Sequence, residues 1–504
     1  MSAARIETIV IVGGGTAGWM AAIYLNRYMR RMNGKVILVE SPTIGTIGVG
    51  EATIPSLVRF IRLLNLDEKE FMRRCSATYK LAIKFEDWVQ DGITYWHPFG
   101  IASGNRVNGL DLFYFWMKRR LEAGSKISYA DYCVQTLLAD AEKAPLPFGG
   151  SSPVWEAGGY AYHLDASALG DYFREIATAE GVVHLFGDVQ DVALNDHGDI
   201  TSLGIGGGRT LSGELFIDCT GFRGRLVEET LKDPWIDWSR FMLCDRAVAM
   251  PLPRGDRFAP YTLSKAMPSG WMWRIPLSSR IGNGYVFSSA HISADAATGE
   301  LIAHSGLRGT RGADPRLINI RIGRRTNFWT RNCIAVGLAS GFIEPLESTG
   351  IHIIQRSILM LLEYLPDRQI NEALRSTYNA RMAGLYDEIR DFIVLHYILT
   401  QRDEPFWRDA RNVPLPDTLR DTLALYDETG RIDNPRLQLF LDANYFYILA
   451  GNGRLPRRPI AEADIAPASE TWHLLDRVRE QNRAFVARMP DHAAYLAELH
   501  RKPV

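Results

Sequence analysis

Three glycines near the start of the chain, Gly13, Gly15 and Gly18, have the G-x-G-x-x-G spacing of a phosphate-binding loop. A β-branched run, residues 9–12, precedes them and a helix-forming stretch follows, which is the context that gives this spacing its meaning. Gly13 permits the tight turn, Gly15 lets the backbone approach a pyrophosphate, and Gly18 lets the helix pack closely on the strand. The free N–H groups and the dipole of the helix start then attract phosphate.

Glu40 ends a second apolar strand, residues 35–39, and lies about 20 residues beyond the glycines, where an acid can bind a ribose hydroxyl. The loop, both strands and this acid together predict a bound dinucleotide, with Thr16 and Ala17 at the helix start that receives its phosphates. FAD is favoured over NAD because the loop lies so near residue 1. The alternative is a glycine turn in some other α/β protein.

Two further residues could do chemistry, Lys80 and Glu347. Lys80 lies in an alternating stretch that predicts a strand, where a lysine usually faces solvent; its apolar neighbours leave burial open. Glu347 lies between a buried strand, residues 332–337, and a helix that begins near residue 351. A carboxylate at a helix start ordinarily stabilises the helix dipole.

Composition excludes several classes of protein. The chain has 504 residues, is 46% hydrophobic and carries a net charge of −1, so a nucleic-acid partner is not indicated. Its five cysteines are scattered without a C-x-x-C pair, which predicts neither disulfides nor a metal site and fits a reducing cytoplasm. We expect no membrane span, because no apolar run reaches the required length of about 18 residues. The first strand begins too early to leave room for a signal peptide.

The order of elements predicts an α/β fold, a doubly wound Rossmann-like box with mixed sheets and a helical block after it. Strands and helices alternate first, and residues 218–221 end a strand at a glycine, where such a sheet touches its cofactor. The glycines at 206–208 lie between two strands, so a hairpin turn is favoured over a second phosphate loop. We expect a box module at 1–350, with substrate-pocket insertions around 67–165, and a helical module at 351–504, packed as one unit.

Four features together resemble the flavin-dependent tryptophan halogenase family: the G-G-G-T-A-G-W loop at 13–19, Lys80, the G-W-x-W-x-I-P motif at 270–276, and P-L-E-S-T-G at 345–350. Their order and spacing hold along the whole chain. The tryptophan motif with the distant lysine is specific, whereas the glycine loop alone is not. The resemblance implies a flavin-binding box topped by a helical pyramid.

The resemblance also implies a reaction. Reduced FAD reacts with O₂ to a flavin hydroperoxide, and halide (chloride or bromide) attacks its terminal oxygen to give hypohalous acid, which diffuses through a tunnel to an aromatic substrate. Lys80 would form a haloamine or donate a hydrogen bond to the oxidant. Glu347 would stabilise the cationic arenium intermediate or take its proton. Thr349 and Gly350 open a helix whose N–H groups suit the halide.

Further cofactor contacts follow from the resemblance. Trp271 and Trp273 would keep organic substrate off the flavin; without the resemblance they are ordinary core aromatics. The remaining cofactor-binding residues would be Ala52, Gly337, Phe342 and Gly350. One phosphate loop leaves no site for a nicotinamide, so a separate flavin reductase would supply FADH₂ by diffusion. The sequence leaves open whether the protein forms a homodimer.

The substrate side departs from the family pattern. His97 and Phe99 match residues that line the indole slot of tryptophan-specific members, and Tyr445 and Phe446 match the pair that holds the amino acid end, with phenylalanine in place of a second tyrosine. Asn452 replaces the glutamate that pairs with the substrate ammonium in those members.

A neutral amide beside a buried ammonium leaves that charge poorly compensated, at a cost of about several kcal/mol. Arg454, Arg457 and Arg458 lie nearby in sequence and would repel an ammonium further. The sequence therefore predicts an indole derivative other than free tryptophan as substrate. Free tryptophan is the alternative.

Two other functions compete. A flavin-dependent aromatic hydroxylase shares the box fold, but it needs its substrate beside the flavin, and the Trp271–Trp273 pair argues against that. A non-catalytic flavoprotein that binds a metabolite or partner is the second. Reduced flavin, bromide and indole would separate these, because a halogenase gives product only with halide.

Overall fold

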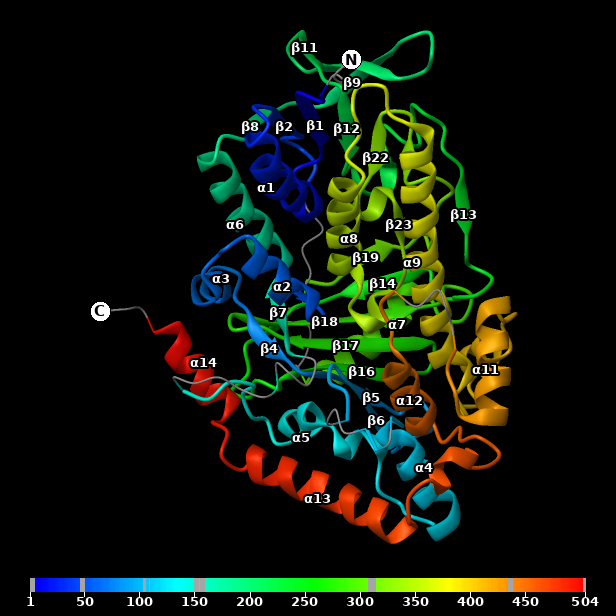
Figure 1. Ribbon diagram of the computed structural model, residues 1–504. Helices are drawn as coiled ribbons and strands as arrows, with labels where there is room; N and C mark the ends of the chain where they lie inside the picture. Colours follow the sequence, from blue (N-terminus) through cyan, green and yellow to red (C-terminus); the bar gives the residue numbers. More distant parts are fainter. Residues whose placement is uncertain are drawn as a thin grey trace.

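The computed structural model describes residues 5–45, 50–102, 106–107, 109–148, 154, 159–306, 314–433 and 438–501. Within these residues it is an α/β structure of five sheets covered and extended by helices (Figure 1). The predicted fold class is confirmed.

The glycine loop belongs to a six-stranded sheet with the strand order β21-β22-β12-β1-β2-β8. β1 (Thr8–Val12) pairs in parallel with β2 (Lys35–Glu40) and with β12 (Leu215–Asp218). All five residues of β1 are buried, as in a parallel strand covered on both faces. The outer strands are β8 (Val183–Phe186), β22 (Cys333–Ala335) and β21 (Trp329–Thr330).

Helices cover this sheet close to the loop. α1 (Thr16–Arg30) follows β1 directly and completes the predicted strand–turn–helix unit. It packs against α6 (Ala166–Ala179) and α8 (Gly350–Glu363). The turn between β1 and α1 therefore lies where several elements converge.

An eight-stranded sheet lies below the first in Figure 1, in the order β19-β14-β18-β17-β16-β5-β6, with β15 pairing with β18. Its neighbours are antiparallel except for the parallel pair β16 and β5. Trp271 and Trp273, two residues apart on β17, share one of its faces. The strands are β5 (Ala82–Glu86), β6 (Thr94–Pro98), β14 (Arg246–Ala249), β15 (Leu252–Pro253), β16 (Tyr261–Met267), β17 (Gly270–Pro276), β18 (Arg280–Phe287) and β19 (Arg316–Asn319).

The remaining strands form three sheets of three strands each. The glycines at 206–208 join β10 to β11, in which Ile205 lies opposite Arg209, so the predicted hairpin turn is confirmed. The members are β3 (Gly50–Ala52), β7 (Ala161–Asp165) and β4 (Thr78–Lys80); β9 (Val189–Leu194), β10 (Ile200–Ile205) and β11 (Arg209–Ser212); and β13 (Trp235–Asp237), β20 (Gly323–Arg325) and β23 (Gly341–Phe342).

The described residues after 350 form helices and loops without strands, as expected for the helical block. They are α8, α9 (Glu372–Ile398), α10 (Pro405–Arg411), α11 (Asp417–Thr429), α12 (Asp442–Gly451), α13 (Ala468–Val486) and α14 (His492–His500). The earlier helices besides α1 and α6 are α2 (Ser56–Leu63), α3 (Glu68–Arg74), α4 (Leu112–Ala123), α5 (Val134–Asp140) and α7 (Ala294–Ser305).

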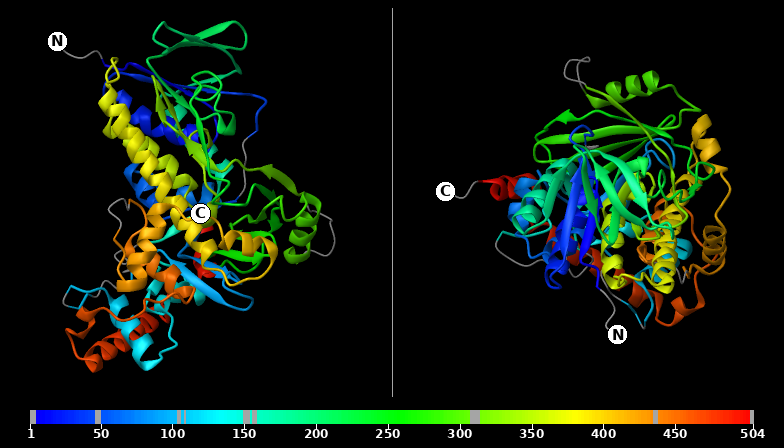
Figure 2. Two further views of the ribbon diagram at one scale, coloured as in Figure 1. Left: turned by 90° about the vertical axis from the view of Figure 1, so that its right-hand side faces the viewer. Right: turned by 90° about the horizontal axis from the view of Figure 1, so that it is seen from above.

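Two of the later helices, α9 and α13, lie at different distances from the glycine loop. α9 runs beside the sheets for much of the molecule's length, and α13 lies far from the glycine loop, against α4 and α5 (Figures 1 and 2). None of the helices described here has the length and apolarity needed to cross a membrane.

Candidate active site

A cavity of about 790 Å³ opens beside the glycine loop and extends to β17 and the start of α8. That volume is in the range of cofactor pockets. The predicted cofactor-binding residues that line it are Gly13, Gly15, Thr16, Ala17, Glu40, Ala52, Gly337, Phe342 and Gly350. Cys219, Thr220 and Gly221 also line it, at the strand end that the sequence placed beside the cofactor.

The loop has the geometry of a diphosphate cradle. Gly13 has φ +111°, and a Cβ there would lie 2.3 Å from the Cys219 carbonyl oxygen, so only glycine fits. Gly18 lies off the cavity, and its close packing leaves no room for a Cβ, which would lie 1.9 Å from the Gly13 carbonyl oxygen. Gly15 caps α1 without a side-chain hydrogen bond, and the first turn has no acid. The N–H groups of α1 are therefore available to an anion, which fits the predicted dinucleotide.

Glu40 lies against this loop and has a partner that the sequence did not indicate. His184 Nε2 lies 2.9 Å from Glu40 Oε2, and the His184 and Trp19 rings are nearly perpendicular with centres 4.8 Å apart. His184 is on β8, an edge strand about which local sequence gave no functional signal. Two more residues missed from sequence line the cavity, Arg223 and Glu51, and burial raises the pKa of Glu51 to about 7.

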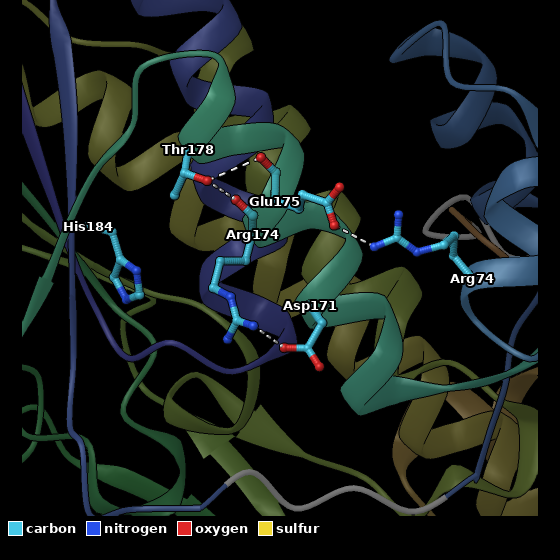
Figure 3. Close-up of a pocket in the computed structure, with 6 residues that line it drawn as sticks. All are labelled: Arg74, Asp171, Arg174, Glu175, Thr178 and His184. Atoms are coloured by element: carbon cyan, nitrogen blue, oxygen red, sulfur yellow. Dashed lines mark hydrogen bonds and ion pairs between the residues drawn. The ribbon is translucent and has the colours of Figure 1, made fainter.

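A second, more open hollow of about 440 Å³ adjoins His184 (Figure 3). Its residues come from α3, α6 and β8: Arg74, Asp171, Arg174, Glu175, Thr178 and His184. Arg74 pairs with Glu175 and Arg174 with Asp171, so its arginines are compensated by neighbouring acids. Such partly exposed ion pairs are ordinary surface features.

Lys80 is fully buried. Its Nζ donates hydrogen bonds to Ser348 Oγ (2.6 Å) and to the Thr53 carbonyl oxygen (3.2 Å), and it lies 4.8 Å from the centre of the Phe99 ring. The expectation of a solvent-facing lysine is wrong, because β4 ends at Lys80 and the chain starts a separate strand at Ala82. Burial lowers the pKa of Lys80 to about 7, although the negative charge of Glu347 opposes this.

Glu347 is buried between two imidazoles. His97 Nδ1 lies 2.7 Å from Oε2, and His396 Nε2 lies 2.9 Å from Oε1, at ion-pair distance but without the direction of a hydrogen bond. Burial alone would raise the pKa of this carboxyl, but the hydrogen bond from His97 and the nearness of both imidazoles outweigh burial and bring the pKa to about 2. Glu347 is therefore ionised at neutral pH.

The hydrogen bonds of Asn444 fix the tautomer of His97. The Leu441 N–H donates to Asn444 Oδ1, so the Asn444 amide group donates through Nδ2 to His97 Nε2, 2.9 Å away. With Nε2 as acceptor, Nδ1 carries the proton that His97 donates to Glu347. The sequence did not point to Asn444 in this role.

His396 was also missed from sequence. It lies within α9, and its Nδ1 lies 3.0 Å from the Tyr95 hydroxyl. Burial lowers its pKa, and Glu347 opposes that shift. One histidine among many helical residues gives no local signal; only the approach of α9 to the turn at 345–347 reveals it.

One residue connects these groups to the large cavity. Ser348, which binds Lys80, lines the cavity, as do Trp271 and Trp273, while Lys80 and Glu347 are not among its lining residues. Ser348 has φ +61°, a left-handed conformation unusual for serine. This backbone strain is typical of functional turns and turns its hydroxyl toward Lys80.

The expected substrate-pocket residues separate into two groups. His97 and Phe99 lie beside Glu347 and Lys80. Phe446 instead stacks on Phe113, with ring centres 3.8 Å apart, and Tyr445 packs edge-on against Phe392; both are buried. These contacts place Phe446 against α4.

Asn452 is buried at the end of α12, and its Nδ2 donates to the Ile448 carbonyl oxygen of the same helix. The expected repulsion from the neighbouring arginines is not supported. Arg454 forms two hydrogen bonds with Asp427, and Arg457 pairs with Glu428 in an exposed position, so both charges are compensated.

A dinucleotide cradle beside a buried amine and an ionised carboxylate defines a cofactor-dependent enzyme site. Residues 8–468 match the family model described as tryptophan halogenase. The tryptophan 6-halogenase ThaL of Streptomyces albogriseolus is 36% identical over 98% of this chain and 99% of its own.

Solved structures agree. BrvH, a flavin-dependent halogenase from Brevundimonas sp. BAL3, is 39% identical and superposes with a TM-score of 0.92 over 98% of this chain and 99% of its own. MibH, described as a lathipeptide tryptophan 5-halogenase, is 30% identical with a TM-score of 0.84 over 99% and 94%. The chain belongs to the tryptophan halogenase family and is a flavin-dependent halogenase, as the motifs predicted. Family membership implies use of flavin and halide, an aromatic substrate and a separate flavin reductase.

Proposed function

We propose that this enzyme uses FADH₂, O₂ and chloride or bromide to halogenate an indole derivative other than free tryptophan. The observation that carries the proposal is a buried amine, Lys80, close enough to a buried, ionised carboxylate, Glu347, to feel its charge, next to a cavity that fits a dinucleotide. A hydroxylase has no comparable need for an amine that handles an oxidant.

The residues of the cavity fit FAD. The start of α1 would hold the diphosphate, Glu40 a ribose hydroxyl, and Trp271 and Trp273 would close the inner end. The reduced flavin, when bound, would supply two of the four electrons that reduce O₂, and the halide would supply the other two as it becomes hypohalous acid. Thr349 and Gly350 are the proposed halide site, because α8 begins there without a side-chain cap or an acid in its first turn, and there is free space beside Gly350.

Lys80 would receive the oxidant. With a pKa of about 7 its ammonium and neutral forms are both populated at neutral pH, so hydrogen-bond donation and haloamine formation are both accessible. Ser348 and Thr53 hold Nζ in place, which keeps the reacting nitrogen fixed.

Glu347 would act mainly by charge. A carboxylate with a pKa of about 2 is a weak base but a permanent negative charge, which suits stabilisation of an arenium cation. The two imidazoles hold it in one orientation.

The test of function combines FADH₂, delivered by a flavin reductase, with bromide and indole. A brominated indole that forms only when bromide is present supports the halogenase. An oxygenated indole formed without halide would support the hydroxylase instead.

We expect a pH dependence from Lys80. Its pKa is lowered, so the neutral amine gains population as pH rises through about 7 and the ammonium gains as pH falls. A halogenation rate with an inflection near pH 7 is therefore expected, rising with pH for the haloamine route and falling for hydrogen-bond donation. In Lys80→Arg, whose charge is permanent, the inflection should vanish; a flat wild-type profile would contradict this assignment.

For the substrate, we expect indole to have a kcat/KM at least about tenfold higher than L-tryptophan, because Asn452 brings no charge to compensate a buried ammonium. The near-isosteric change Asn452→Asp should reduce this difference, because it should raise kcat/KM for L-tryptophan and leave kcat/KM for indole unchanged. MibH, described as a lathipeptide tryptophan 5-halogenase, is a family member whose description names a peptide. A wild-type preference for free tryptophan would show that another acid supplies the charge.

We also expect the purified protein to leave NADH unoxidised, because the described residues contain one phosphate loop. The rate of NADH oxidation, measured with added FAD in the absence and in the presence of a flavin reductase, checks this. NADH oxidation by the protein alone at the rate of halogenation would refute the need for a partner.

A further inference from the structure

The indole N–H of Trp271 is held by a buried carboxylate three residues before Glu347. Trp271 Nε1 donates to Glu344 Oε2 at 2.8 Å, and the Tyr397 hydroxyl donates to the same oxygen at 2.6 Å. Glu344 is fully buried. The carboxylate therefore connects β17 to α9 through a single oxygen atom.

Trp271 is the residue that this bond orients. It is 2% exposed and lines the large cavity, where its ring lies 6.2 Å from that of Trp273 and 6.4 Å from that of Trp88. Packing alone tolerates more than one setting of a tryptophan χ2 angle, which is a broad torsion. A directional bond to the indole nitrogen selects one of them.

The same helix fixes the wall and the catalytic carboxylate. His396 and Tyr397 are consecutive on α9, and they contact Glu347 and Glu344 respectively. Glu344 directly precedes the short 3₁₀ turn Pro345–Glu347, in which Glu347 is the last residue. A change in the bond at Glu344 is therefore transmitted to the wall without passing through Lys80.

Holding Glu344 in this place is costly. Its Oε1 has no hydrogen-bond partner among the described residues, and burial raises its pKa to about 7 even though Tyr397 and Trp271 donate to it. A buried acceptor with incomplete hydrogen bonding calls for an explanation, and a positioning role supplies one.

We propose that Glu344 is a positioning residue that locks the Trp271 indole in the wall of the large cavity, so that the small oxidant leaves the flavin toward Lys80 and an aromatic substrate cannot enter. This inference rests on the proposed halogenase function. Glu344 acts through Trp271 and takes no part in the chemistry.

The first test measures how firmly the Trp271 indole N–H is held. In ¹⁵N-labelled protein with oxidised FAD bound, the Trp271 indole N–H signal is the one missing in Trp271→Phe. Its exchange with water should be slow in the wild type and about tenfold or more faster in Glu344→Leu, which removes the acceptor. Glu344→Gln retains an acceptor oxygen and should keep exchange slow. If Glu344→Leu does not fold, Glu344→Asp, which withdraws the acceptor by one methylene, replaces it with the same expectation.

The second test measures the amount of brominated indole that is formed per FADH₂ consumed. This ratio should fall in Glu344→Leu, fall in Trp271→Phe, and fall no further in the double variant, because both changes loosen the same wall. Trp329→Phe is the matched control: Trp329 is buried, donates to the Arg331 carbonyl oxygen and does not line the cavity, so the ratio should hold.

Unchanged indole exchange in Glu344→Leu (or in Glu344→Asp where it replaces Glu344→Leu), or fully additive losses in the double variant, would overturn the proposal. A wild type that makes no halogenated product would defeat the halogenase function instead. The exchange experiment would still decide whether Glu344 holds Trp271.

Discussion

Replacing Lys80 with methionine is expected to lower the halogenation rate by about 10²–10⁴-fold while O₂-dependent oxidation of FADH₂ continues. Methionine is close to lysine in length and fills the buried site, so the change removes the amine rather than the packing. Lys80 does not line the large cavity, and its link to that cavity is Ser348. Product formation and flavin oxidation, followed in the same reaction, check the separation of the two steps.

A second lysine provides the control. Lys84 lies four residues further on, is partly exposed and pairs with Glu86. Lys84→Met should leave halogenation within about twofold, as a surface change does. Full activity in Lys80→Met would contradict a role of Lys80 in halogenation and leave it a purely structural role.

Replacing Glu347 with glutamine is expected to slow halogenation by about 10²–10³-fold without loss of FAD binding. Glutamine keeps the shape but removes the negative charge that His97 and His396 hold in place. The acid lies outside the residues that line the cavity, so the FAD dissociation constant should not change. Rapid-mixing rates and FAD titration measure the two quantities.

Glu388 is the matched control for a buried carboxylate. It accepts backbone N–H bonds from residues 438–440 and contacts neither Lys80 nor Glu347 in the hydrogen bonds of the structure. Glu388→Gln should lower the free energy of unfolding by about 1–3 kcal/mol and leave the FAD dissociation constant unchanged. Equal kinetic losses in both variants would contradict a specific role for Glu347.

The strand–turn–helix unit around the glycine loop and the fold class could be predicted from local sequence. The strand, glycine turn and helix of residues 8–30 are adjacent in sequence, and each favours its own conformation, so loop and fold class follow from a short stretch. The partner of Glu40 did not follow, because His184 reaches it from β8, 144 residues away.

The surroundings of the proposed catalytic residues depend on long-range contacts. The burial of Lys80 follows from the break between β4 and β5, which alternation of residue types does not reveal. His396 lies on α9, 49 residues beyond Glu347, and nothing near it in sequence marks it. Arg454 was misread for the same reason, since Asp427, which compensates it, lies 27 residues earlier on α11.

The central claim is that an oxidant made at the flavin reaches the substrate through Lys80. A single turnover of enzyme loaded with FADH₂, mixed with O₂, bromide, indole and a β-diketone that traps free hypobromous acid, tests it most directly. The account predicts brominated indole in the wild type, and in Lys80→Met brominated trap with almost no brominated indole. Equal bromination of indole by both proteins, or an oxygenated indole from the wild type, would contradict it.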